Sequence, residues 1–207
     1  FFYERMQFLR GFGNILADVK RHPDKLLELG EKLADWYCWL IDQWAKIGCD
    51  GIITTDDWGT NHGTFISPKD FKSIFHPLYK QVIEHCHDHE MLFVLHSCGN
   101  IYSLIPSLID TGVDCLQLDS PRMTGLDRLA EFGGKISYMC VADIAEVIPF
   151  KTPKEVEVEV YRMIKKLGIF NGGLIGTIYA DTTALHFPPE NMKAVIRAYK
   201  RFGTILN

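Results

Sequence analysis

A histidine and a cysteine lie two residues apart at the end of an apolar run, in the sequence FVLHSCGN over residues 93–100. Side chains alternate between the two faces of a β-strand, so His96 and Cys98 point the same way if the extended run continues. Imidazole and thiolate are common zinc ligands, and this pair could therefore form half of a zinc site. The alternative is a core thiol beside a histidine that hydrogen-bonds a loop.

Two adjacent carboxylates follow a second apolar run. Asp56 and Asp57 come directly after residues 52–55 and precede Trp58. Adjacent side chains on an extended chain face opposite ways, so we expect only one of the two to enter a cleft at the end of this strand. A loop-capping role is the alternative for either carboxylate.

The elements that must position these residues alternate regularly along the chain. Apolar runs predict strands near residues 52–55, 92–95, 115–118, 136–139 and 174–178. Helical periodicity and capping residues predict helices over 23–48, 67–90, 101–111, 126–132, 152–167 and 188–202. Such alternation indicates a parallel α/β sheet, in either a (β/α)8 barrel or a doubly wound form. Both forms place functional residues after the strands, where the polar residues of this chain gather.

Composition narrows the functional class. The formal charge of −4 gives no electrostatic reason to expect binding to nucleic acid or to an anionic membrane. No apolar run approaches the roughly 20 residues of a membrane-spanning helix. The six cysteines are dispersed singly rather than arranged as a disulfide framework, which indicates a reducing, cytoplasmic location.

Three further histidines lie near the end of the helix predicted at 67–90. His85, His87 and His89 are spaced by two residues, and this spacing keeps neighbouring pairs off a shared helix face. Protonated histidine is favoured at a helix C-terminus by the helix dipole. We therefore expect no metal cluster there.

Six short motifs are distributed along the chain. They are FLRGF at 8–12, DDWGT at 56–60, ISP with DF at 66–71, LHSCGN at 95–100, PFKTP at 149–153 and PPEN at 188–191. Their sequences and order resemble the uroporphyrinogen decarboxylase superfamily, which includes zinc-dependent corrinoid methyltransferases. The resemblance implies a (β/α)8 TIM barrel. Residues 1–207 would then be a single domain that supplies about the last five β/α units, with the N-terminal part missing. It also implies a homodimer, for which the tryptophan-bearing helix at 23–48 could supply the interface.

The resemblance further implies a set of site residues. Methyltransferases of this superfamily hold zinc on a His-x-Cys pair and a later cysteine, and His96 and Cys98 match the pair. Counted back from the PPEN motif, the later cysteine is replaced here by Asp181, whose carboxylate is also an acceptable zinc ligand. A harder ligand favours activation of water or of an alcohol or ether oxygen over a thiol. Asp56 matches the aspartate of the superfamily's Asp-x-Trp pattern, so Asp56 and Asp181 are the expected catalytic carboxylates.

Two activities follow from the resemblance. The first is a methyltransferase that moves a methyl group between a small methyl donor or acceptor and a corrinoid carried by a partner protein, at a zinc site. The second is a uroporphyrinogen decarboxylase, a lyase of porphyrin biosynthesis that uses no metal. A non-catalytic remnant of the barrel is a third reading. His96 and Cys98 favour the first activity, and an aspartate at position 181 weakens it.

Overall fold

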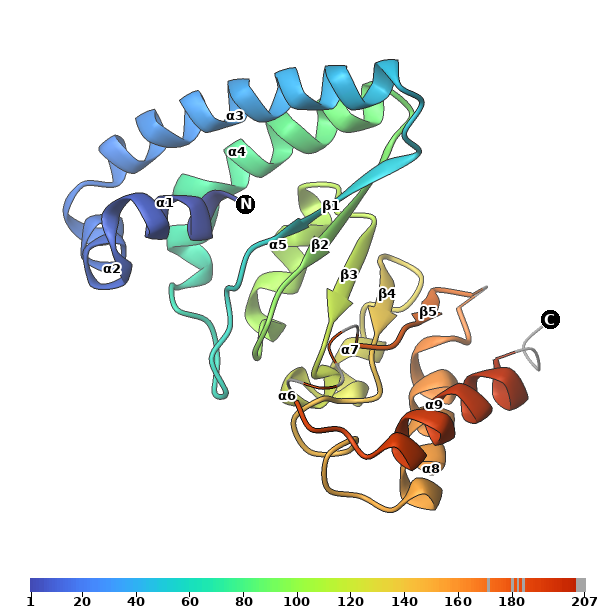
Figure 1. Cartoon of the computed structure of the whole chain (residues 1–207). Helices are drawn as coiled ribbons and strands as arrows, with labels where there is room; N and C mark the ends of the chain where they lie inside the picture. The colour runs from blue at the N-terminus through green and yellow to red at the C-terminus, as the bar shows by residue number, and fades with distance from the viewer. Residues whose placement is uncertain (171, 180, 182, 184, 204–207) are drawn as a thin grey trace. The chain divides into compact units, whose positions relative to one another are not determined.

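The computed structural model describes residues 1–170, 172–179, 181, 183 and 185–203 (Figure 1). By its internal contacts the chain divides into two compact units, Phe1–Cys115 and Leu116–Asn207, which are described separately below. The strands form a five-stranded sheet in the order β1-β2-β3-β4-β5, the order in which they occur in the chain. A doubly wound sheet reverses its strand order at a switch point, whereas a barrel does not, so this order favours the barrel.

The first unit consists of two parallel strands and a set of helices. Its elements are α1 (Phe2–Arg10), α2 (Phe12–Arg21), α3 (Pro23–Lys46), β1 (Gly51–Thr55), α4 (Pro68–Asp88), β2 (Leu92–His96), the 3-10 turn η1 (Tyr102–Leu104) and α5 (Ile105–Asp110). Strands β1 and β2 pair in parallel, with Thr55 opposite His96. The strands therefore end level with each other, directly before the residues singled out by the sequence.

Helices α3 and α4 lie side by side and are the longest helices of this unit (Figure 1). Helix α4 begins as predicted, since the Ser67 hydroxyl accepts a hydrogen bond of 3.1 Å from the Asp70 N–H and Pro68 occupies the first turn. Gly30 of α3 faces Leu78 of α4, and a Cβ atom at Gly30 would lie 2.1 Å from a Leu78 methyl carbon. The absence of a side chain at Gly30 thus allows the two helices to approach closely.

The second unit repeats the strand and helix alternation. Its elements are β3 (Cys115–Leu118), whose first residue closes the first unit, α6 (Pro121–Thr124), α7 (Leu126–Ala130), β4 (Ser137–Cys140), α8 (Pro153–Leu167), β5 (Leu174–Gly176) and α9 (Pro189–Phe202). Strands β4 and β5 pair in parallel. Thr152 and Glu155 form a reciprocal capping box at the start of α8, and apolar residues of α8 and α9 share one core.

Several elements differ from the sequence prediction. Helices α1 and α2 are additional, and they are separate because Gly11 between them adopts a φ of 85°. The helix predicted at 101–111 is divided into η1 and α5, because Pro106 has no N–H to continue the helical hydrogen bonds. Strand β5 ends at Gly176, two residues before the predicted end at residue 178. At Gly176 a Cβ atom would lie 2.4 Å from the Tyr199 ring.

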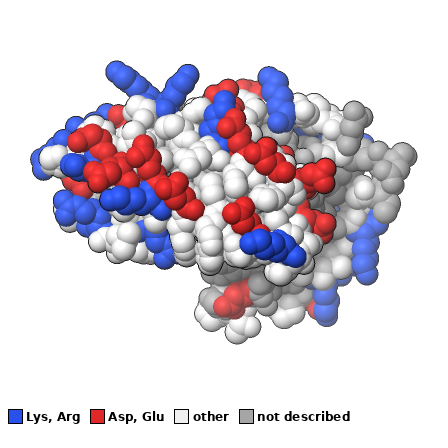
Figure 2. Space-filling model, turned by 90° about the horizontal axis from the view of Figure 1, so that it is seen from above, with Lys and Arg blue, Asp and Glu red and all other residues white. Residues whose placement is uncertain are grey.

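Surface charge is mixed. On the face shown in Figure 2, Lys and Arg side chains lie among Asp and Glu side chains. Among the described residues, no helix combines the length and the apolar character needed to cross a membrane.

Two glycines bring together the loops that follow β1 and β2. The Gly59 N–H donates a hydrogen bond of 3.1 Å to the Cys98 carbonyl, and the Asn100 N–H donates one of 2.7 Å to the Thr60 carbonyl. A Cβ atom at Gly59 would lie 2.5 Å from the Cys98 carbonyl oxygen. Gly99 has a φ of 80°, and a Cβ atom there would lie 2.3 Å from the Gly59 carbonyl carbon. Because the opposing atoms are backbone, neither clash can be relieved by a side-chain movement.

Substitution of Gly59 therefore tests this contact. We expect Gly59→Ala to lower the free energy of unfolding by about 1–3 kcal/mol, as overpacking does elsewhere. Gly63→Ala is the matched control in the same loop, since a Cβ atom at Gly63 meets nothing within 4 Å, and it should change stability by no more than about 0.5 kcal/mol. Urea denaturation followed by tryptophan fluorescence measures both values, and equal effects would contradict the close approach.

Candidate metal centre

Three potential metal ligands meet where β1 and β2 end. Asp57 lies two residues beyond β1, His96 ends β2, and Cys98 follows two residues later. The His96 Nε2 atom lies 3.4 Å from the Cys98 Sγ atom and 3.4 Å from the Asp57 Oδ1 atom. One ligand atom from each of the three residues lies within 4.8 Å of the other two. The structure thus brings together the predicted pair, His96 and Cys98, with a carboxylate from the neighbouring strand.

These distances fit zinc. A tetrahedral zinc ion with ordinary bond lengths holds nitrogen and oxygen ligands about 3.4 Å apart and nitrogen and sulfur ligands about 3.6 Å apart. Imidazole, thiolate and carboxylate are all zinc ligands, and three protein ligands are typical of a site that keeps its fourth position for a substrate or water. The His96 side chain is only 14% exposed, whereas that of Asp57 is 41% exposed.

Backbone hydrogen bonds hold the three residues in place. The Cys98 N–H donates a bond of 2.8 Å to Asp57 Oδ1, and the Trp58 N–H donates one of 3.0 Å to the Ser97 hydroxyl. Burial acts to raise the pKa of Asp57, but hydrogen bonds from His96 and from the Cys98 N–H outweigh it, and the net pKa lies below its usual value. Asp57 is therefore a charged carboxylate at neutral pH, the form in which it can bind a metal.

Asp56 has a different environment. Its side chain is fully buried and accepts hydrogen bonds from the Tyr79 hydroxyl at 2.6 Å and from the N–H groups of Tyr3 and Glu4 at 3.0 and 2.8 Å. Burial raises the pKa of Asp56, and these hydrogen bonds oppose the rise. Asp56 thus binds the first turn of α1, where a carboxylate is favoured by the helix dipole. The carboxylate beside His96 and Cys98 is that of Asp57, not the preferred Asp56, whose catalytic role stays a prediction.

The neighbouring tryptophan explains which carboxylate faces the cluster. Trp58 is fully buried, stacks on Tyr3 at 4.7 Å between ring centroids, and contacts the Phe75 ring at 4.8 Å. Residues two apart on an extended chain share a side, so burial of Trp58 turns Asp56 inward and Asp57 the other way. The same rule, applied to the sequence with Trp58 assigned to the core, would have identified Asp57.

Asp181 belongs to the second unit. It follows β5 and is exposed. Its role as a metal ligand and catalytic carboxylate stays a prediction.

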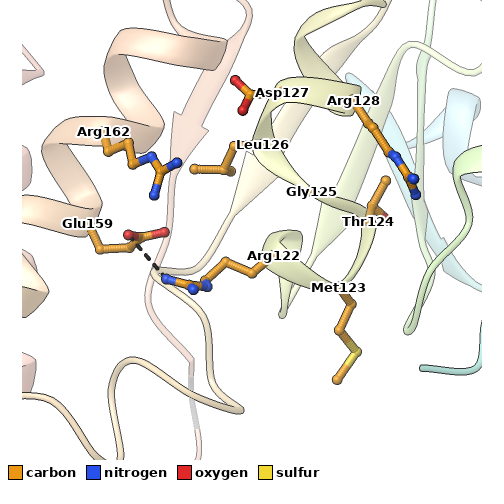
Figure 3. Close-up of a pocket in the computed structure, with 9 residues that line it drawn as sticks. All are labelled: Arg122, Met123, Thr124, Gly125, Leu126, Asp127, Arg128, Glu159 and Arg162. Atoms are coloured by element: carbon orange, nitrogen blue, oxygen red, sulfur yellow. Dashed lines mark ion pairs between the residues drawn. The ribbon is translucent and has the colours of Figure 1, made fainter. Parts of the chain in front are cut away.

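The second unit contains a polar cavity of about 430 Å³ beside α6, α7 and α8 (Figure 3). In this cavity an Arg122 nitrogen lies 3.3 Å from a Glu159 oxygen, and Arg162 also lines the cavity. The sequence reasoning missed this cavity. Arg122 lies just after β3, and a cationic side chain at the end of a strand is the signal that could have indicated it.

Comparisons with known proteins identify the family. Residues 6–202 match the family model for uroporphyrinogen decarboxylase (URO-D). A "Methylated-thiol--coenzyme M methyltransferase" from Methanosarcina mazei is 23% identical over 192 residues, which are 93% of this chain and 49% of that relative. The chain thus spans about half the length of this curated relative. A solved structure of a methyltransferase from Methanosarcina mazei matches with a TM-score of 0.70 at 17% identity, over 91% of this chain and 52% of that chain. That match confirms the predicted α/β class as a portion of a TIM barrel, and the family model, which covers almost all of the sequence, shows that this chain belongs to the uroporphyrinogen decarboxylase family.

Proposed function

We propose that this chain is part of a methyltransferase that moves a methyl group between a small substrate and a corrinoid carried by a partner protein, at a zinc site. The observation that carries the proposal is the spacing of His96, Cys98 and Asp57, which fits the ligand distances of tetrahedral zinc. A relative whose name is that of a methyltransferase supports the same class of reaction. A metal-independent decarboxylase has no need of an imidazole, a thiol and a carboxylate at these distances.

The residues of this chain would hold the ion and orient it. His96 would bind through Nε2 and Cys98 through its thiolate, and Asp57 would add a negative charge that its hydrogen bonds already stabilise. When bound, zinc would lower the pKa of a substrate thiol, hydroxyl or water and polarise an ether oxygen. A carboxylate ligand leaves more positive charge on the metal than a second thiolate does. The proposed substrates therefore include oxygen compounds, such as methoxylated molecules, as well as methylated thiols.

The proposed site has two candidate carboxylates. Asp57 offers an oxygen within 4.8 Å of the ligand atoms of His96 and Cys98, and Asp181 is the ligand that the family resemblance implies. Binding by both would close the tetrahedron, whereas binding by one would leave the fourth position for substrate. We propose Asp57 as the third ligand and Asp181 as a carboxylate that acts on the substrate, together with the predicted contribution of Asp56.

We further propose that residues 1–207 are one part of a single barrel domain, that the complete protein is cytoplasmic, and that it forms a homodimer. Trp36 and Trp39 of α3 are 46% and 55% exposed and could lie in such an interface. The second candidate function is a uroporphyrinogen decarboxylase, which the description of the matching family favours.

Cobalt substitution tests the thiolate ligand directly. Metal-free protein loaded with Co²⁺ should show the near-ultraviolet charge-transfer band of a cobalt–thiolate bond, and Cys98→Ala should abolish the band without unfolding the chain. Cys49→Ala is the matched control, because Cys49 lies in the loop after α3 and outside the cluster. A band that persists in Cys98→Ala would refute the proposed centre.

Two asparagine substitutions separate the roles of the carboxylates. Asn keeps the shape of Asp but lacks its charge, so we expect Asp57→Asn to weaken zinc binding by at least about ten-fold, the lower end of the loss seen when even an outer-shell partner is removed. Asp181→Asn should change zinc affinity little. Competition with a chromophoric chelator measures both constants. If only Asp181→Asn weakens binding, the family-implied ligand set is correct and ours is not.

Transfer of a methyl group tests the function itself. The full-length protein loaded with zinc should remove the methyl group from free methylcobalamin when a thiol acceptor is added, as followed by visible absorption. His96→Ala should lose this activity, and Cys49→Ala should retain it. Release of carbon dioxide from uroporphyrinogen by the metal-free protein, with no methyl transfer, would establish the decarboxylase instead.

A further inference from the structure

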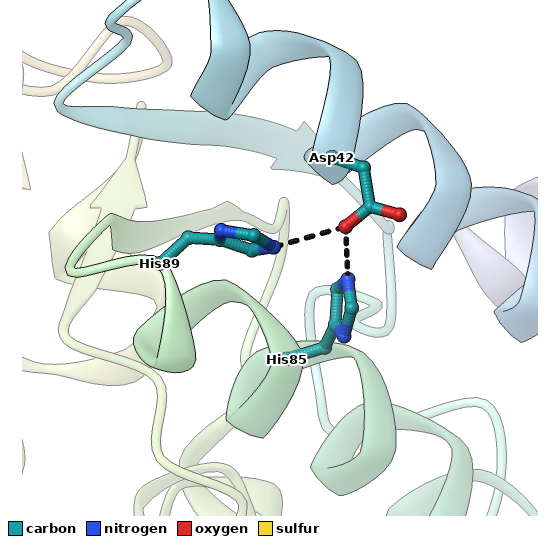
Figure 4. Close-up of side chains that lie close together, drawn as sticks. All are labelled: Asp42, His85 and His89. Atoms are coloured by element: carbon teal, nitrogen blue, oxygen red, sulfur yellow. Dashed lines mark hydrogen bonds and ion pairs between the residues drawn. The ribbon is translucent and has the colours of Figure 1, made fainter.

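A second cluster of ligand atoms lies between α3 and α4, the helices that precede β1 and β2, whereas the first cluster follows these strands (Figure 4). Asp42 is on α3, His85 is in the last turn of α4, and His89 is the C-cap residue that directly follows α4. The Nε2 atoms of His85 and His89 lie 2.8 and 2.9 Å from the same oxygen, Asp42 Oδ1. Figure 4 shows both imidazole rings directed at the carboxylate from the opposing helix.

The spacing of the histidines explains this convergence. Residues four apart lie on the same face of a helix, which places His85 directly below His89, with ring centroids 5.1 Å apart. His87, between them, turns to another face and lies 2.9 Å from an oxygen of Asp114. The sequence argument compared only histidines two apart. It overlooked the pair His85 and His89, which do share a face and converge on one carboxylate, so the argument from spacing is corrected, while the expectation that no metal binds here stays untested.

We propose that Asp42, His85 and His89 form a second metal site, which binds zinc or another divalent transition metal and joins α3 to α4. This inference is independent of the proposed function. Two imidazoles and one carboxylate are a donor set that zinc and similar metals accept in proteins. The three side chains are 32–39% exposed, so an ion can reach them and keep water at its remaining position.

The geometry needs only a small adjustment to hold an ion. The observed distances are those of hydrogen bonds from two ring N–H groups to one oxygen. A tetrahedral zinc ion would hold each nitrogen about 3.4 Å from the oxygen, so each ring would retreat by about 0.5 Å and give up its Nε2 proton. The hydrogen bonds from His85 and His89 lower the pKa of Asp42. Its carboxylate is therefore charged at neutral pH and ready to bind a cation.

Zinc binding can be measured without interference from the first cluster. The background for the experiment is the chain with His96→Ala and Cys98→Ala, which removes two ligands of that cluster. Zn²⁺ is titrated into tag-free, metal-free protein in competition with a chromophoric chelator. We expect one zinc ion per chain in the background, and loss of that ion when His89→Ala is added. Zinc should also raise the melting temperature of the background and not that of the His89→Ala variant, because the ion joins two helices.

His87→Ala is the matched control, since His87 lies on the same helix and also pairs with an aspartate. It should leave zinc binding unchanged. Asp42→Asn provides a second test if His89→Ala reduces helix content by circular dichroism, because Asn retains a hydrogen-bond acceptor and should still lose zinc. Zinc binding only at millimolar concentration in the background, or an equal loss in His87→Ala, would show that the three residues form hydrogen bonds and no metal site.

Discussion

Main-chain hydrogen bonds between the two segments continue past the ends of β1 and β2, and the cluster of Asp57, His96 and Cys98 depends on them. The Asp56 N–H donates to the His96 carbonyl at 2.9 Å, and the Gly59 N–H donates to the Cys98 carbonyl at 3.1 Å. These two bonds flank Asp57, and the Cys98 N–H donates a third bond, of 2.8 Å, to the Asp57 carboxylate. The distances among Asp57, His96 and Cys98 thus depend on main-chain hydrogen bonds and on two glycines, Gly59 and Gly99, that permit the close contact. The backbone thus already holds the three residues together, and only their side-chain rotamers need to adjust for an ion to bind, as in a preorganised site.

The two adjacent aspartates illustrate how environment divides the roles of identical side chains. Asp56 is buried, its pKa is raised, and it stabilises the start of α1. Asp57 is partly exposed, and hydrogen bonds from His96 and Cys98 lower its pKa despite partial burial. Proton removal is therefore opposed at Asp56 and favoured at Asp57. Of the two, Asp57 is the better prepared to bind a cation.

Much of the fold could be predicted from local sequence. Apolar runs located β1 to β4 to within one residue at each end, and Ser67-Pro68 and Thr152-Pro153 marked the helix starts that form. Period-two alternation was sufficient to place His96 beside Cys98. No helix was predicted before residue 23, whereas α1 and α2 form there and are separated at Gly11. Predicting that Asp57, and not Asp56, lies beside His96 and Cys98 required knowledge of the side on which Trp58 packs. Asp42 lies 43 residues before His85 in the chain. Predicting that these two residues meet would require the register between α3 and α4, which no local sequence pattern contains.

The two clusters differ in ways that suit different tasks. The first includes a cysteine and a histidine that is only 14% exposed, and it lies after parallel strands, where barrels of this kind place chemistry. Charges interact more strongly in such a shielded position than in water. The second has no sulfur, its histidines are 32% and 36% exposed, and its ligands come from the outer surfaces of two packed helices. Water screens that position, so an ion there would act chiefly on the energy of holding α3 against α4. The proposed roles, chemistry for the first cluster and a structural link for the second, therefore rest on the difference in exposure and donor type more than on the number of ligands.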